Sequence, residues 1–138
     1  MATITLFTKF HEGTLDGDYA LDTASDTYVC LLDSTASAPS LSLTTYSELT
    51  NELPTANGYT VGGEPIGNPT VDSAGVFDGD DVTWGPGATF ASRYGVIYKH
   101  SATQYLIGYI DFESLQTVTN GTFTIQWNLA GILQSTSV

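Results

Sequence analysis

The chain has 138 residues, the length of one domain, so we expect residues 1–138 to form a single folded unit. Fifteen acidic residues against three basic ones give a net charge of −12, which disfavours direct binding to nucleic acids and anionic membranes. No apolar run approaches the roughly 20 residues that cross a bilayer, and the first ten residues lack the basic and apolar regions of a secretory signal. We therefore expect a protein that is made in a cytoplasm.

Residues 3–10 begin with an alternation of apolar and Thr side chains, which predicts a first strand. Phe7 and Phe10 break this alternation and are candidate contact residues for a neighbouring protein, although core or rim packing is the favoured interpretation. If they are contact residues, residues 1–12 are a candidate contact arm. The Asp-Gly pair at 16–17 predicts a turn.

Residues 26–33 are apolar on both faces, which predicts a central strand that holds the single cysteine as a buried core residue. One cysteine allows no intrachain disulfide and no zinc site built from cysteines. Thr45 and Glu48 match a capping box, so we expect one short helix near 46–53 that covers an open end of the β-structure. Two consecutive glycines at 62–63 indicate a bulge or a close approach of two backbones.

The most strand-like part of the sequence is a predicted hairpin. Residues 92–99 and 104–112 are rich in β-branched and aromatic side chains, and a polar turn at 100–103 joins them. Both faces of both strands carry apolar residues, so we expect the hairpin to be central and covered on both sides. Tyr98 and Tyr105, one on each strand, are further candidate contact residues.

The remaining segments complete an all-β pattern. Residues 85–87 predict a loop, and the Asn-Gly pair at 120–121 predicts a two-residue hairpin turn. Residues 122–128 alternate cleanly between apolar and polar side chains, as a strand with one buried face does, and 134–138 are expected to fray. Short strands separated by turns predict an all-β fold, a single antiparallel β-sandwich of jelly-roll-like form with one short helix near 46–53.

Residues that could carry catalysis are few. His11 and His100 are the two histidines, and no nucleophile-elbow pattern accompanies them. We therefore expect no enzyme, no cofactor and no resident metal.

Acidic residues offer one alternative to this expectation. Asp78, Asp80 and Asp81 lie at a predicted turn, where Asp is favoured by its own side-chain hydrogen bonds. The same three carboxylates could form a calcium site, or could pair with Asp111 and Glu113 in glycoside hydrolysis. We interpret them as turn residues, with calcium binding as the next hypothesis.

Aromatic residues offer a second alternative. Eight Tyr and two Trp in a domain with few charges could form a platform for sugars or an interface with another protein. Trp84 and Trp127 fall within predicted strands, so we predict that both are buried in the core.

From residue 59 to residue 133, the sequence resembles small structural proteins of tailed bacteriophages. The matching pieces follow one another in the same order and cover a little over half of the chain. They are Gly58-Tyr59 with Gly62-Gly63, Asp81-Val82-Thr83-Trp84, Arg93-Tyr94-Gly95-Val96-Ile97-Tyr98, Leu106-Ile107-Gly108-Tyr109-Ile110-Asp111-Phe112, Thr122-Phe123-Thr124-Ile125-Gln126-Trp127-Asn128 and Gly131-Ile132.

The resemblance implies a virion component, and among these a capsid decoration (cement) protein. Such proteins are compact β-sandwiches or jelly rolls on the outer surface of the phage head, often homotrimers that tie neighbouring subunits of the major capsid protein together. The family has no catalytic motif to transfer to this chain. We therefore expect a homotrimer that binds the major capsid protein, stabilises the capsid lattice and binds neither nucleic acid nor membrane.

Two other functions remain open from the sequence. The first is a tail, neck or fibre component of the same kind of particle, binding a host glycan or another tail protein through aromatic residues. The second is a hydrolase, which would use Asp80, Asp81 or His100.

Overall fold

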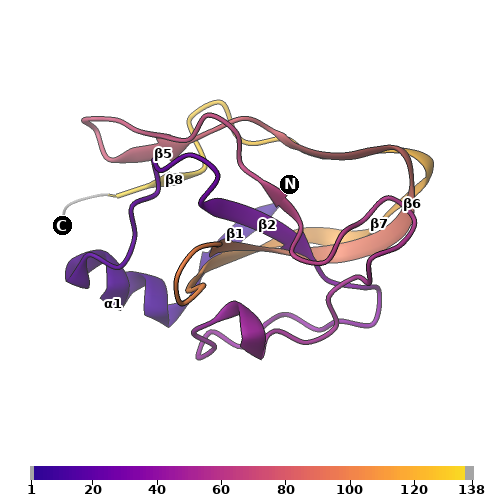
Figure 1. Cartoon of the computed structure of the whole chain (residues 1–138), viewed down its shortest axis with the longest axis horizontal. Helices are drawn as coiled ribbons and strands as arrows, with labels where there is room; N and C mark the ends of the chain where they lie inside the picture. The colour runs from indigo at the N-terminus through magenta and orange to yellow at the C-terminus, as the bar shows by residue number, and fades with distance from the viewer. Residues whose placement is uncertain (1, 136–138) are drawn as a thin grey trace.

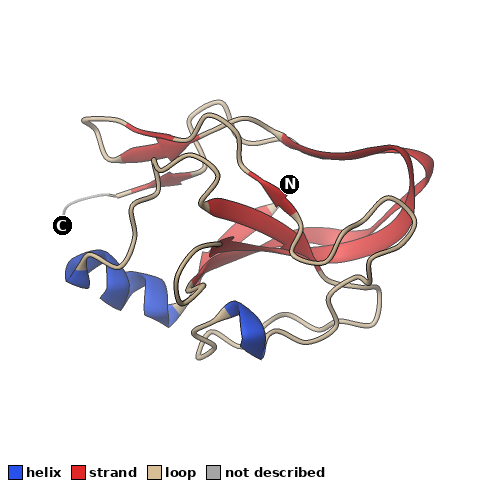
Figure 2. Cartoon of the chain, in the orientation of Figure 1, coloured by secondary structure: helices blue, strands red, loops and turns tan. Residues whose placement is uncertain are grey.

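The computed structural model describes residues 2–135 and is mainly composed of strands (Figures 1 and 2). Its elements in chain order are β1 (Thr3–Leu6), α1 (Thr8–Asp16), β2 (Thr27–Leu31), the 3₁₀ helix η1 (Tyr46–Glu48), β3 (Glu64–Pro65), β4 (Thr70–Val71), β5 (Val76–Asp78), β6 (Val82–Lys99), β7 (Leu106–Ile125) and β8 (Leu133–Gln134). Residues 136–138 of the predicted frayed tail lie outside the described residues, whereas residue 134 belongs to β8.

The strands form two antiparallel sheets. The larger has the order β1-β7-β6-β2-β3, and the smaller has the order β4-β5-β8. This arrangement confirms the predicted all-β sandwich. The segment expected as a contact arm contributes β1, which pairs with β7 through the register Thr3–Asp111 to Leu6–Gly108.

The predicted central hairpin is confirmed, since β6 and β7 pair with each other and lie between β1 and β2. The two strands are longer than expected, because both continue through segments predicted as turns. Residues 85–87 are an insertion in β6, where the pairing moves from Trp84–Phe123 to Ala88–Gly121. The Asn-Gly pair at 120–121 likewise lies within β7, so the predicted two-residue hairpin turn is wrong.

A larger irregularity bends the paired strands. Between the pairs Ser92–Gln116 and Tyr94–Asp111, β6 advances by two residues and β7 by five. Extra residues on one strand bend a ribbon and increase its twist. Figure 1 shows β6 and β7 turning at the right of the view and returning above the larger sheet. The first half of β6 and the second half of β7 therefore belong to the upper layer of the sandwich.

Both faces of the larger sheet are covered, as predicted. The inner face packs against the upper layer in a core that contains Val29, Leu31, Ile97, Ile107, Ile110, Phe77, Val82, Trp84, Ile125, Trp127 and Ile132. The outer face packs beneath the chain between β2 and β3, in a second cluster that contains Phe7, Cys30, Leu32, Tyr94, Val96, Tyr98 and Leu106. Cys30 is fully buried, which confirms its prediction as a core residue.

The predicted helix at 46–53 is reduced to the single turn η1. The capping box of Thr45 and Glu48 is present, but the backbone becomes extended at Leu49. The following residues make β-type contacts instead, since the Leu53 amide donates to the Leu31 carbonyl and Glu52 bridges to Leu32. Tertiary pairing thus outweighs local helix propensity here. The segment covers the outer face of the larger sheet rather than an open end (Figure 2).

Helix α1 occupies residues that were predicted as strand and turn. Phe10 and Gly13 form its buried side, and a Cβ on Gly13 would lie 2.4 Å from the ring of Tyr19. The predicted turn at 16–17 is the end of this helix, where Gly17 adopts φ 81° and its amide donates to the Gly13 carbonyl. With only two buried positions, α1 has too weak an apolar periodicity to be recognised from the sequence.

Candidate functional site

Three of the four predicted contact residues are core residues. Phe7 and Tyr98 are 0% exposed and Phe10 is 9% exposed, so their expected place on a contact surface is corrected. Phe7 lies between β1 and α1, and both Phe7 and Tyr98 belong to the second cluster. Tyr105 is half-buried, with the Lys9 ammonium 4.3 Å from the centre of its ring.

The other aromatic residues are covered in the same way. All sixteen Phe, Trp and Tyr residues of the chain are buried or half-buried. Trp84 and Trp127 are 2% and 9% exposed, which confirms their predicted burial. A sugar-binding platform needs open ring faces, whereas the half-buried ring of Tyr28 is stacked on His100 at 3.9 Å between ring centres.

All three cations of the chain are held by contacts within it. The Lys9 ammonium lies 2.7 Å from the Asp18 carboxylate, and this hydrogen bond raises the pKa of Lys9. The Lys99 ammonium donates to the Asp18 carbonyl at 3.1 Å. Arg93 donates to Asp111 at 3.2 Å, which lowers the pKa of that carboxyl. The basic side chains therefore tie elements together instead of forming a basic patch.

The acidic residues of the predicted turn also serve the fold. Asp80 accepts a hydrogen bond from the Asn68 amide at 2.7 Å, and the Asp80 carbonyl accepts from the Trp127 indole at 2.9 Å. Asp81 accepts from the Trp127 backbone amide at 3.0 Å. Asp78 lies in β5 and pairs with Thr70. Within residues 2–135, no three His, Cys, Asp or Glu side chains gather as they would around a metal ion.

The remaining catalytic candidates lie on separate elements. His11 is exposed on α1, and His100 follows β6, where its amide donates to the Asp26 carbonyl. Asp111 is paired with Arg93 and accepts the backbone amide of Glu113 at 2.7 Å. The buried thiol of Cys30 has a pKa raised by its burial, so it stays protonated and unreactive in the folded chain.

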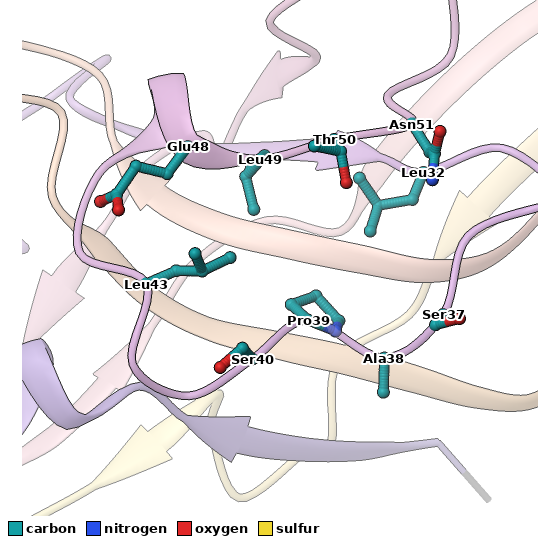
Figure 3. A pocket seen from close by; sticks show the side chains of 10 residues that line it. All are labelled: Leu32, Ser37, Ala38, Pro39, Ser40, Leu43, Glu48, Leu49, Thr50 and Asn51. Carbon is teal, nitrogen blue, oxygen red and sulfur yellow. The ribbon is translucent and has the colours of Figure 1, made fainter.

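One cavity of about 370 Å³, the loop pocket, opens beside η1 (Figure 3). Figure 3 shows Leu43 and Leu49 on opposite sides of it. The Glu48 carboxylate at its edge accepts hydrogen bonds from Thr44 and Thr45, which lower its pKa to about 2. This carboxylate is committed to the capping box. The pocket is lined by Leu32, Ser37, Ala38, Pro39, Ser40, Leu43, Glu48, Leu49, Thr50 and Asn51.

A second hollow of about 430 Å³, the neutral groove, follows the second half of β7, residues 116–125, which returns above the larger sheet. None of its lining residues is charged. Sequence reasoning missed this surface, although a signal was present, since residues 114–138 contain no Asp, Glu, Lys, Arg or His. The groove is lined by Ala2, Phe112, Gln116, Thr117, Val118, Thr122, Phe123, Thr124, Ile125 and Gln126.

Comparisons of the chain with protein-family models, with curated proteins and with solved structures found no match. No helix within residues 2–135 has the length and apolar character needed to cross a membrane. Within residues 2–135, the fold and its surfaces define an acidic all-β sandwich with covered aromatic residues, cations held by internal contacts and an uncharged groove.

Proposed function

We propose that this chain is a structural protein of a tailed-bacteriophage virion, a capsid decoration (cement) protein that binds the outside of the head. The distribution of charge carries the proposal. The net charge is −12, and each of the three cations is held by Asp18 or Asp111 of the same chain. Such a surface is repelled by packaged DNA, which suits a position on the outer surface of a capsid.

The sequence pieces that resemble phage structural proteins support the proposal. Most of them belong to one structural unit, since residues 93–98 lie in β6, residues 106–112 lie in β7, and residues 81–84 and 122–128 overlap the far ends of these strands. The resemblance therefore follows the skeleton of the sandwich. The first matching pieces, Gly58-Tyr59 and Gly62-Gly63, lie outside this unit, in the chain between β2 and β3.

The proposed mechanism is mass action. A protein that binds only the assembled lattice stabilises that lattice by its binding free energy. Copies arranged as homotrimers bind several subunits of the major capsid protein at once, so weak contacts combine through avidity. The uncharged, hydroxyl-rich parts of the surface supply such contacts without bringing carboxylates of this chain against its partner.

The alternative proposal is a tail, neck or fibre component of the same kind of particle. Its glycan-binding form is disfavoured by the covered aromatic residues, because sugars stack on open ring faces. Its protein-binding form could use the loop pocket and the neutral groove as well as the cement function could. The hydrolase hypothesis is weakened because Asp80 and Asp81 are engaged in hydrogen bonds with Asn68 and Trp127.

Heat treatment of particles tests the proposal. Particles assembled without this chain are expected to lose their genome at a lower temperature than complete particles, and addition of the purified chain restores the difference. A chain unfolded by heat and then added serves as the control. Equal heat stability with and without the chain, together with no binding of the purified chain to particles, would refute a cement function.

A further inference from the structure

The returning half of β7 has one edge without a strand partner. Residues 82–99 of β6 pair along one side of β7, whereas β1 covers the other side only from Gly108 to Asp111. From residue 116 to residue 125, the second edge of β7 pairs with no other strand of residues 2–135. An unpaired edge of this kind presents backbone donors and acceptors to any strand that approaches it.

The corresponding edge of β6 is covered by a loop, whereas the edge of β7 carries only a bulge between Val118 and Gly121. On β6, Pro86 removes a backbone donor, and the loop before β3 covers the edge, since the Thr89 amide donates to the Asn57 carbonyl. A Cβ on Gly58 would lie 2.9 Å from the Ala88 backbone, so this loop lies directly against the strand. Residues 116–125 of β7 contain no proline and no charged side chain, two of the devices that prevent edge pairing. The register shift between Val118 and Gly121 leaves residues 121–125 as the regular part of this edge.

The neutral groove lies along this free edge. Consecutive residues of β7 line it, 116–118 and 122–126, and consecutive residues of a strand point to opposite faces. The hollow therefore follows the edge of the strand rather than one face. Ala2, the residue before β1, also lines the groove, so the groove continues the line of β1 along β7. Its apolar part includes Phe112 and Phe123, which are both half-buried.

The absence of charge favours a second copy of this chain as the occupant. Two copies of this chain each carry −12 and repel each other wherever their carboxylates meet. The neutral groove avoids this repulsion, because none of its ten lining residues is ionisable at neutral pH. Thr side chains already pair between β6 and β7, with 3.2 Å between the hydroxyls of Thr83 and Thr124. A strand of an approaching copy can make the same kind of contact with Thr117 and Thr122, which are exposed.

We infer that the free edge of β7, residues 116–125, is the surface through which a second copy of this chain binds, by adding a strand beside β7 over the neutral groove. Backbone hydrogen bonds supply the affinity, and the apolar part of the groove takes alternate side chains of the added strand. The inference gives a surface to the self-association that the proposed function assumes. Its test uses the purified chain alone, so it can fail while binding to the capsid is still observed.

The test is the molar mass of the purified chain, measured by light scattering from dilute to concentrated solution. The edge variant is Thr117→Glu with Thr122→Glu, and the control variant is Thr23→Glu with Thr50→Glu. All four threonines are exposed, so both variants keep the core and gain the same charge. We expect the wild type and the control to associate, and the edge variant to associate at least about tenfold more weakly because like charges oppose each other.

Salt separates this result from simple misfolding. Raising the ionic strength screens repulsion between surface charges, so it should restore association of the edge variant, which a misfolded variant would not show. A wild type that stays monomeric at high concentration would overturn the inference. An edge variant that associates as strongly as the wild type would overturn it as well.

Discussion

Gly63 is the position where a single methyl group should damage the fold most. It has φ +79°, and a Cβ built on it would lie 1.8 Å from the Val29 carbonyl oxygen. Gly17 provides a matched control, since it has φ +81° and nothing lies within 4 Å of the corresponding Cβ. Substitution by Ala changes the unfolded chain in the same way at both positions, so the difference between the variants reports the contact alone.

The magnitudes follow from these two environments. Gly17→Ala should lower the free energy of unfolding by about 1 kcal/mol, the cost of a left-handed backbone for a residue with a Cβ. Gly63→Ala carries the same cost and must also push β3 away from β2, where Glu64 pairs with Val29 and Pro65 with Tyr28. Each buried hydrogen bond left unmade costs about 1–3 kcal/mol, so we expect a total near 4 kcal/mol.

Urea unfolding followed by tryptophan fluorescence measures both values. Thermal unfolding provides a second reading, at about 4 °C per kcal/mol for a chain of this size. The reasoning would be refuted if Gly63→Ala were as mild as Gly17→Ala, because β2 and β3 would then tolerate separation at no cost.

Three further predictions use the same unfolding assays. Tyr59→Phe should cost about 1–3 kcal/mol, since its buried hydroxyl accepts the Leu31 amide at 2.9 Å; a loss below 0.5 kcal/mol, about the lower limit for a net hydrogen bond, would contradict this. Trp84→Phe should lower the free energy of unfolding less than Trp127→Phe does. Within residues 2–135 the buried indole nitrogen of Trp84 has no hydrogen-bond partner, whereas that of Trp127 donates to the Asp80 carbonyl at 2.9 Å. The reverse order of the two losses would contradict this prediction. The stabilisation due to Glu48 should be present above pH 4.5 and lost as the pH falls towards 2, because its pKa is lowered in the folded chain. The difference between wild type and Glu48→Gln should therefore shrink over that range, and a constant difference would count against the role of this carboxylate.

Features that depend on neighbouring residues could be predicted from the sequence. The apolar content of 92–112 identified the hairpin and its covered faces, and the alternation at 122–128 correctly placed Ile125 and Trp127 inside. The glycine pair at 62–63 was predicted as a bulge or a close approach of backbones, and Gly63 makes such an approach to β2.

Features that depend on distant residues could not be predicted from the sequence. The capping box at Thr45 is formed, yet the helix ends after one turn because Leu53 pairs with the end of β2. The Asn-Gly pair at 120–121 has the composition of a hairpin turn, but its strand is already paired with β6, so the same residues form a bulge. In both places tertiary pairing outweighs a local preference.

The surfaces were the least predictable part. Phe7 and Phe10 break the strand alternation because a helix begins between them, not because they face a partner. The neutral groove arises from the bend between Asp111 and Gln116, which brings Ala2 and Phe123 to one hollow. The absence of charge after Glu113 could be seen in the sequence, but its meaning depends on which edge of β7 stays unpaired.

The copy number of this chain in purified particles tests the central proposal most directly. The chain and the major capsid protein would be quantified in the same particles by mass spectrometry with labelled peptide standards. A cement protein should be present at a level close to that of the major capsid protein, or at one trimer for each local threefold position. A handful of copies for each particle would contradict the cement function and favour a tail or neck component, and complete absence would contradict a place in the virion.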